Sequence, residues 1–305
     1  MALELREQFL GWMHVEQGRS VHTVDAYRRD LADYESWLHK RRSAPVGATS
    51  ADVEAFVQHL RARGLAATTV ARRFAAVRVF HRWMCDEGRR RDDPCALVDG
   101  VRVPAGLPKA LTEESVEALL AAVTGDDSLA RRDRALLEFL YATGARISEV
   151  CGLSMADLDM DDSLARLLGK GNKERIVPFG SGAHRALRDW FDEGGRARLV
   201  PARWRSRDDA DAVFLGVRGT RLTRQAAFTI VRKWATVAGI REHLSPHVLR
   251  HSCATHMLVH GADLRVVQEL LGHSSVSTTQ VYTRVDNDLL AETYRAAHPR
   301  AMIER

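Results

Sequence analysis

One segment of the sequence gathers side chains that could act on a phosphate group. Two histidines, one arginine and one tyrosine lie between residues 245 and 283, in an otherwise apolar and helical frame. A guanidinium fork matches phosphate oxygens, an imidazole can hydrogen-bond or move a proton, and an activated phenol can attack as a nucleophile. The combination therefore indicates nucleophilic attack on a phosphate. The four candidates are His247, Arg250, His273 and Tyr282.

The spacing of these residues predicts how helices would present them. His247 and Arg250 are three residues apart, so on a helix they share one face. Ser245 is a good N-cap for that helix, with a proline at its first position. His273 directly follows the glycine that ends the next amphipathic helix, and Tyr282 lies in a polar Ser/Thr run where no core aromatic is expected. Any one of the four could serve packing alone, but their concentration in one segment favours a site.

Two further cationic positions lie upstream. Arg146 stands at the expected start of a short helix, where free backbone N–H groups and the helix dipole favour an anion. A structural ion pair with Glu149 is the alternative interpretation. Residues 164–179 have the composition of a β-hairpin, and its turn offers two lysines, Lys170 and Lys173. A lysine at a hairpin tip is usually only solvated, and the residues alone do not choose between the two.

The first 90 residues predict a compact domain of four helices, because apolar side chains recur at helical spacing between glycine and serine breaks. The polar faces of these helices are rich in arginine. A solvated surface is the ordinary interpretation of such pairs, but several on neighbouring helices favour contact with a phosphate backbone. The candidate DNA-binding residues are Arg28, Arg29, Arg72, Arg73, Arg78 and Arg82.

A proline-rich connector follows this domain. Residues 91–110 contain three prolines and two glycines, which predict an extended linker. Residues 111–305 then form a second domain of helices, with the hairpin and a short strand at 213–216 adding a small β-sheet. The expected fold is mainly α with a small sheet in the second domain. The basic segment 194–212 is expected to be a loop or a frayed helix end, with an open role in DNA or partner contact.

Composition sets broad limits on function. The chain has 305 residues, 45 Lys and Arg against 40 Asp and Glu, and a sequence pI near 9.2, all compatible with binding nucleic acid. No apolar run approaches the ~18 residues of a membrane span, and the first residues lack a secretory pattern, so we expect a cytoplasmic protein. The scattered cysteines argue against a disulfide framework or a structural zinc site, and Cys253 is expected to be a small buried residue. The cysteines are Cys85, Cys95, Cys151 and Cys253.

The chemistry-bearing positions together resemble the active site of the tyrosine recombinase (phage integrase) family. His-x-x-Arg, Leu-Gly-His and a tyrosine nine residues later match its C-terminal half, and ATGARISE and GKGNKER supply the earlier arginine and lysine in the expected order. The resemblance runs nearly end to end and selects Lys170 over Lys173. The segments GADLRVVQELLGH and STTQVYT are similar to the bacterial Xer subgroup, and YRAAHPRA favours its XerC branch over XerD.

The resemblance implies a mechanism for these residues. Tyr282 would attack a phosphodiester to give a 3′-phosphotyrosine, while two arginines bind the non-bridging oxygens and the lysine protonates the leaving 5′ oxygen. His247 would assist the tyrosine proton and the second histidine would hydrogen-bond the phosphate. No metal, ATP or other cofactor is required, and the chain lacks a GxxxxGK[ST] sequence. The implied catalytic set is Arg146, Lys170, His247, Arg250, His273 and Tyr282.

The family also implies partners. The N-terminal domain (1–90) and the catalytic domain (111–305) would close around double-stranded DNA as a clamp. The C-terminal tail would dock on a neighbouring subunit, with packing on its own domain as the alternative. A XerC-like enzyme would act with a XerD-like recombinase in a heterotetramer on a dif-like site, resolving chromosome dimers at cell division, with the septal DNA translocase FtsK as regulator.

Other classes of function remain open at this point. A type IB topoisomerase would share the chemistry but relax supercoils, and the compact helical domain and Xer-like segments disfavour it. A catalytically silent DNA-binding protein is disfavoured by the complete residue set. A metal-dependent nuclease has the least support, because no carboxylate cluster accompanies the candidate residues.

Overall fold

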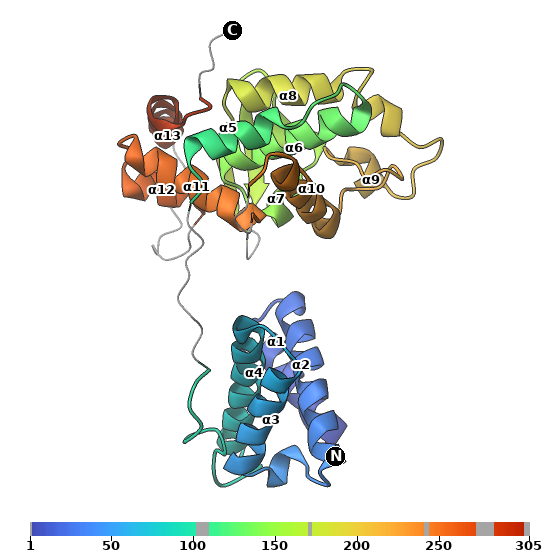
Figure 1. Cartoon of the computed structure of the whole chain (residues 1–305), viewed down its shortest axis with the longest axis vertical. Helices are drawn as coiled ribbons and strands as arrows, with labels where there is room; N and C mark the ends of the chain where they lie inside the picture. Colours follow the sequence, from blue (N-terminus) through green and yellow to red (C-terminus); the bar gives the residue numbers. More distant parts are fainter. Residues whose placement is uncertain (1, 102–109, 170–172, 241–243, 273–283, 302–305) are drawn as a thin grey trace. The chain divides into compact units, whose positions relative to one another are not determined.

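The computed structural model divides the chain into two compact units, Met1–Gly106 and Leu107–Arg305 (Figure 1). Each unit has its own hydrophobic core. Side chains are described from residue 4 and, in the last helix, from residue 290 onward. The described backbone comprises residues 2–101, 110–169, 173–240, 244–272 and 284–301.

The first unit contains the four predicted helices. Their apolar stripes meet in an aromatic core, in which Phe9 packs on Phe80 and Trp83 with ring centroids 5.1 and 5.5 Å apart. The buried Tyr34 hydroxyl is 2.9 Å from His81 Nε2, which satisfies a polar group inside this core. The helices are α1 (Ala2–Val15), α2 (Val21–Lys40), α3 (Ser50–Ala62) and α4 (Ala67–Asp86), with a short 3₁₀ helix η1 (Pro45–Gly47) between α2 and α3.

The first part of the predicted linker belongs to this unit. The buried Arg90 side chain donates to the carbonyl oxygens of Pro45 and Ala48, each at 3.0 Å. Cys95 and Val98 are buried in the same core. The division between Gly106 and Leu107 lies within the predicted linker 91–110, and the first residues of that linker fold back to cover the end of the helical bundle.

The second unit is built around α6 (Ser128–Thr143), which is buried along its whole second half and packs against α8 and α11. Thr112 caps α5 and Ser245 caps α11, as the sequence predicted. The remaining helices are α5 (Glu113–Ala121), α7 (Ile147–Gly152), η2 (Met155–Asp157), α8 (Ser181–Phe191), η3 (Arg196–Leu199), α9 (Arg207–Asp211), α10 (Arg224–Val237), α11 (Pro246–Val259), α12 (Leu264–Leu271) and α13 (Arg284–Ala297).

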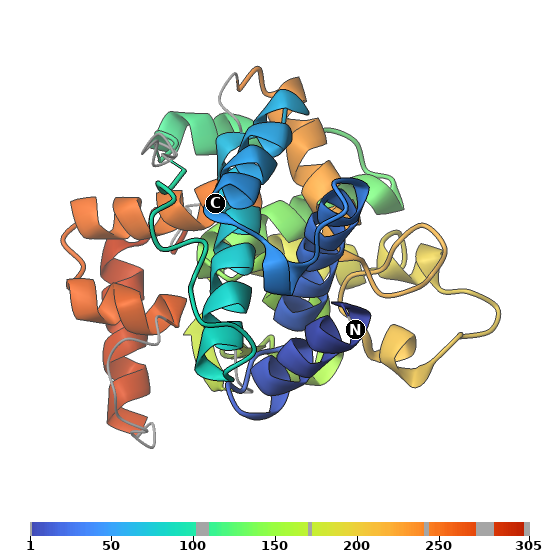
Figure 2. The ribbon, with the colours of Figure 1, turned by 90° about the horizontal axis from the view of Figure 1, so that it is seen from below.

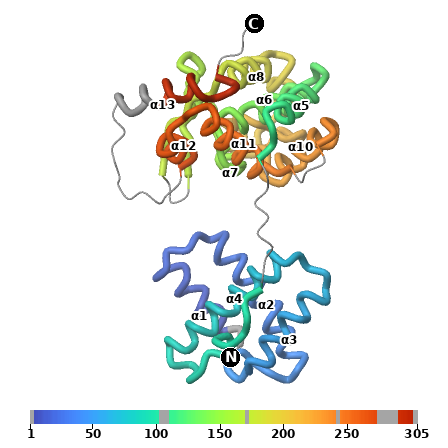
Figure 3. The backbone as a smooth tube through the Cα atoms, turned by 60° about the vertical axis from the view of Figure 1, so that its left-hand side comes forward, coloured from blue at the N-terminus to red at the C-terminus, as the bar shows by residue number. Residues whose placement is uncertain are grey.

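A small antiparallel sheet lies beside α12 (Figure 3). Its order is β1 (Leu158–Asp159), β2 (Leu164–Leu168) and β3 (Glu174–Pro178), with Leu168 opposite Glu174 at the end nearest the turn. The predicted hairpin is confirmed for its described residues.

The predicted strand at 213–216 does not form as a strand. Only isolated bridges join Ser154 to Ala212 and Leu215 to Arg221 within the described residues. The run is apolar because it is buried in the core, where Val213 N donates to Leu153 O at 3.0 Å. An apolar run of this length can be buried without being a strand, which is why the sequence misled.

The basic segment 194–212 is ordered by one of its own arginines. Arg196 donates to the carbonyl oxygens of Ala210 and Ala212 at 2.7 and 2.8 Å, and its guanidinium lies 5.8 Å from the Trp204 ring centroid. Part of the basic character of this segment therefore serves local structure, including η3 and α9.

The C-terminal helix α13 packs on its own unit against α11 and α12 (Figures 1 and 2). The buried Tyr294 hydroxyl accepts a hydrogen bond from Gly180 N at 2.9 Å, and Ser181 N donates to Ala301 O at 3.1 Å. His298 stacks on Tyr294 with ring centroids 4.7 Å apart, and burial lowers its pKa to about 3. The described part of the tail thus closes the core of the second unit.

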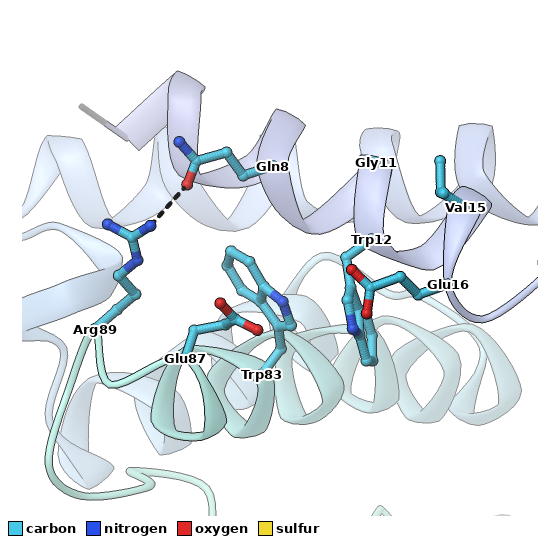
Figure 4. A pocket seen from close by; sticks show the side chains of 8 residues that line it. All are labelled: Gln8, Gly11, Trp12, Val15, Glu16, Trp83, Glu87 and Arg89. Atoms are coloured by element: carbon cyan, nitrogen blue, oxygen red, sulfur yellow. Dashed lines mark hydrogen bonds between the residues drawn. The ribbon is translucent and has the colours of Figure 1, made fainter.

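A groove of about 390 Å³ lies between α1 and α4 of the first unit (Figure 4). Trp12 and Trp83 form its aromatic wall, and Arg89 donates to Gln8 at 3.5 Å at one end. The buried Trp83 Nε1 has no hydrogen-bond partner among the described residues. The groove is thus an open edge of the aromatic core.

In the described part of the chain, no helix is both long and apolar enough to cross a membrane.

Candidate phosphate site in the second unit

Arg146 is positioned by the turn between α6 and α7. Gly144 ends α6 in the left-handed region (φ 56°), and Arg146 is the N-cap of α7. Its backbone N–H and its Nη1 donate to the two carboxylate oxygens of Glu149, each at 2.8 Å, and its Nη2 donates to Gly272 O at 3.1 Å. The structural pair with Glu149 is therefore real. The side chain is still 34% exposed, so it can also meet a ligand.

Glu149 is shared with a second arginine that the sequence prediction missed. Arg175 on β3 donates to both oxygens of Glu149, at 2.9 and 2.7 Å, and its Nε donates to Leu270 O at 2.9 Å. Burial alone would raise the pKa of Glu149, but the hydrogen bonds and charges of the two arginines hold it below its ordinary value. The signal for Arg175 was present in the sequence. It shares the core-facing side of its strand with Val177, and a charged residue is rarely buried at such a position without an ionic or hydrogen-bonding partner.

Arg250 is also buried in the site. It is 8% exposed on α11 and donates to Gly144 O at 2.7 Å and to Leu271 O at 2.6 Å. Within the described part of the chain, no carboxylate pairs with it. Burial lowers its pKa to about 10, and the neighbouring charge of Arg146 acts in the same direction. A buried cation without a counter-ion is costly, so this position is suited to receive an anion.

The three arginines meet around one loop and one helix end. Arg146 and Arg250 both bond the C-terminal end of α12, at Gly272 and Leu271, and Arg250 also bonds the Gly144 carbonyl. Three guanidinium groups thus surround the single carboxylate of Glu149. The arrangement leaves positive charge uncompensated and can bind a phosphate through charge-assisted hydrogen bonds.

The structure brings some predicted site residues together. His247 is exposed on α11, three residues before Arg250 and on the same helix. Cys253 is fully buried, as predicted. Three predicted catalytic residues lie outside the described residues, so their roles remain predictions. They are Lys170, His273 and Tyr282.

Three of the six arginines predicted to contact DNA in the first unit are paired with acids. Arg28 bonds Glu7 at 2.9 Å and Asp25 at 3.1 Å, and Arg29 donates to the Asp25 carbonyl at 3.2 Å. Arg72 pairs with Asp30 and Arg73 with Asp33, while Arg78 lies 5.6 Å from the Phe74 ring centroid and Arg82 is exposed. Binding a phosphate backbone at the paired positions would require exchange of these partners.

Known proteins resemble both parts of this chain. Residues 7–88 match the model described as phage integrase, N-terminal SAM-like domain, and residues 109–288 match the phage integrase family. A tyrosine recombinase XerD of Bifidobacterium longum (strain NCC 2705) is 44% identical over 97% of both chains. A tyrosine recombinase XerC of Xanthomonas campestris pv. campestris (strain B100) is 41% identical over 97% of this chain and 88% of its own.

Solved structures show the same fold. The XerH site-specific recombinase bound to a palindromic difH substrate aligns with a TM-score of 0.68 and 23% identity, over 92% of this chain and 81% of that one. A lambda integrase (75–356) dimer bound to a COC′ core site gives a TM-score of 0.68 at 15% identity, over 92% of this chain and 98% of that one. The predicted fold class, a helical N-terminal domain with a mainly α catalytic domain and a small sheet, is confirmed.

Proposed function

Because this chain belongs to the phage integrase family and is a Xer-type tyrosine recombinase, we propose that it cuts and rejoins DNA through a 3′-phosphotyrosine on Tyr282. Tyrosine recombinases are enzymes of site-specific DNA recombination. One observation carries the proposal. Arg250 is a buried guanidinium that no carboxylate of the described residues pairs with, and it lies beside the partly exposed Arg146. A scissile phosphate supplies the missing negative charge.

The proposed reaction exchanges one phosphoester for another. The Tyr282 oxygen bonds to phosphorus as the bond to the 5′ oxygen breaks, and Arg146 and Arg250 hold the non-bridging oxygens, where charge builds. An ordinary tyrosine has a pKa of about 10, so its proton needs an acceptor at neutral pH, a role we assign to His247. Lys170 protonates the leaving 5′ oxygen, and the remaining predicted residue, His273, hydrogen-bonds the phosphate.

The reverse reaction seals the strand. A 5′ hydroxyl attacks the phosphotyrosine, the tyrosine leaves and regains its proton, and no net phosphoester bond is lost. The proposed chemistry therefore needs neither ATP nor a metal ion. Activity that persists in EDTA is the expected result.

A nicked suicide duplex tests this proposal directly. A nick close to the cleavage point lets the short 5′-hydroxyl fragment diffuse away, so the covalent adduct accumulates and shifts the protein on a denaturing gel. We expect wild-type protein to form the adduct and Tyr282→Phe to form none while binding DNA with unchanged affinity. Wild-type protein that binds its duplex and forms no adduct would falsify the proposal.

The biological setting is also a proposal. XerD and XerC enzymes are both among the relatives, which supports a recombinase that acts with a second Xer protein at a dif-like site. We assign this chain the XerC role beside a XerD-like partner, in chromosome dimer resolution in the cytoplasm, with FtsK as regulator. Sequencing the DNA held in the trapped adduct identifies the site, and mixing with the purified partner shows which strand each enzyme cleaves.

The arginine-rich helices of the first unit and the C-terminal tail complete the proposed assembly. The six candidate arginines on α2 and α4 would contact the phosphate backbone, and the tail would dock on a neighbouring subunit when the tetramer forms. The described part of the tail packs on its own unit, so docking in trans would begin from the residues that precede or follow it.

A further inference from the structure

Arg175 occupies a position that no part of the proposed chemistry uses. It is 6% exposed, and each of its three guanidinium nitrogens has a partner in the structure. Two partners are the oxygens of Glu149, and the third is the backbone oxygen of Leu270. A buried guanidinium bonded through all three nitrogens is rigid, because moving it would leave charges and polar groups unpaired.

The first connection of Arg175 leads to Arg146. Glu149 accepts from Arg175 with both oxygens and from Arg146 with both oxygens. Without Arg175, Arg146 would be the one guanidinium among the described residues that still hydrogen-bonds the buried Glu149 carboxylate. Arg146 would then be held by Glu149 more strongly, and a phosphate would have to compete for it.

The second connection leads to the residue before His273. The guanidinium of Arg175 lies against Gly272, where a Cβ atom would be only 3.1 Å from Nη1 and 3.2 Å from Cδ. Gly272 also has a left-handed backbone (φ 69°), so two constraints favour glycine there. Arg146 donates to the Gly272 carbonyl, which closes a ring of contacts through Arg175, Glu149, Arg146 and the end of α12.

The third connection leads to the residue before Lys170. Arg175 is opposite Leu167 in the hairpin, and Gly169 N donates to Lys173 O at 2.8 Å where the strands approach the turn. A Cβ atom on Gly169 would lie 3.6 Å from Glu149 Oε1 and 3.7 Å from Arg175 Nη1. The turn end of the hairpin, at Gly169, therefore packs against the ion pair between Arg175 and Glu149.

We propose that Arg175 is a positioning residue that fixes the hairpin, Arg146 and the end of α12 in one register for DNA cleavage. This inference rests on the proposed function, because Lys170 and His273 are its predicted catalytic residues. In this proposal, Arg175 contacts neither the DNA nor the reacting atoms. It acts by holding Gly169 and Gly272, the residues that directly precede Lys170 and His273, and by balancing the charge of Glu149.

The test compares two leaving groups in single-turnover cleavage. A duplex with sulfur in place of the bridging 5′ oxygen expels a thiolate, which leaves without a proton and so bypasses Lys170. We expect Arg175→Met to slow cleavage of the oxygen duplex by about 100-fold, the cost of a small misplacement. The loss of cleavage rate on the sulfur duplex should be at least tenfold smaller than the loss on the oxygen duplex. DNA affinity should stay within about twofold, because the loss belongs to the transition state.

Two further variants make the result decisive. Arg175→Lys keeps the charge and the stem but loses the fork, so we expect a partial loss with the same preference for sulfur, even if Arg175→Met fails to fold. Arg166→Met removes an exposed arginine from the same hairpin, paired with Asp157 at 2.7 Å, and should cleave both duplexes like wild type.

Two outcomes overturn the inference. One is a folded Arg175 variant that cleaves the oxygen duplex at the wild-type rate. The other is an equal loss on both duplexes, since the hairpin would then not be held by Arg175. A failure of the proposed function is recognised separately, because wild-type protein would then form no covalent adduct on either duplex.

Discussion

Arg250 donates to two backbone oxygens, and among the described residues no carboxylate forms an ion pair with it. Burial and the nearby Arg146 lower its pKa, yet at about 10 the group is still protonated at neutral pH. Two of its donors are engaged by Gly144 O and Leu271 O, which fix the plane of the guanidinium. The fork is thus oriented before any phosphate arrives, and orientation in advance is what lowers a reaction barrier.

Arg250→Lys tests this view of the residue. A lysine keeps the charge but cannot satisfy both carbonyl oxygens and a phosphate with a fixed fork. We expect adduct formation to slow by about 100-fold or more, the range found when one oriented donor is removed. Single-turnover cleavage measures the rate, and an Arg265→Lys variant on the exposed face of α12 serves as control. A rate within threefold of wild type would show that charge alone suffices.

Element boundaries near the site were largely predictable, because local chemistry sets them. Ser245 accepts from Val248 N as an N-cap, and Gly144 and Gly272 end their helices in left-handed conformations. The hairpin followed from alternation and its turn. By contrast, Arg175 was missed, because its partners Glu149 and Leu270 come from other elements.

The packing of the linker's first residues and the absence of the predicted strand have the same origin. Residues 91–98 read as a connector in composition, but burial against the helical bundle decides their place. The apolar run at 213–216 reads as a strand, but its neighbours bury it without a continuous ladder. Long-range packing overrides the local pattern in both cases, and a single sequence carries little of that information.

The Tyr294 hydroxyl joins helix α13 to Gly180, the N-cap of α8, and the loss of this hydrogen bond should be measurable. Tyr294→Phe leaves the buried Gly180 N–H without its acceptor, at a cost of about 1–3 kcal/mol. We expect the unfolding transition of the second unit to fall by several degrees. Differential scanning calorimetry on the full chain measures this, with the exposed Glu292→Gln on the same helix as control. An unchanged transition would mean that this contact contributes nothing to the fold.

The whole molecule should lose stability in mild acid through its buried histidines. Burial lowers the pKa of His298 and of His81 to about 3, against an ordinary value of 6.5. Below pH 6.5 the unfolded chain therefore takes up protons that the folded chain refuses, so stability falls as the pH falls from 6.5 toward 3. Each histidine contributes a slope of up to about 1.4 kcal/mol per pH unit.

The two units allow this prediction to be resolved by calorimetry. His298→Asn keeps an acceptor for the Arg300 N–H but cannot be protonated, so the second unit should become less sensitive to pH between 7.5 and 5. The first unit, which holds His81, should keep its wild-type dependence. His251→Asn, at an exposed position on α11, is the control. The same acid sensitivity in the His298 variant and wild type would exclude this origin.

Because backbone carbonyls hold Arg250, the site tolerates some amino-acid substitutions around it better than others. Every amino acid carries a backbone oxygen, so no exchange at residue 271 can delete that acceptor. Gly144 is the exception, because a Cβ atom there would lie 2.7 Å from a Leu271 methyl carbon and the backbone is left-handed. In a random library, changes at codon 144 should therefore inactivate the enzyme, although this residue contributes only its backbone to the site.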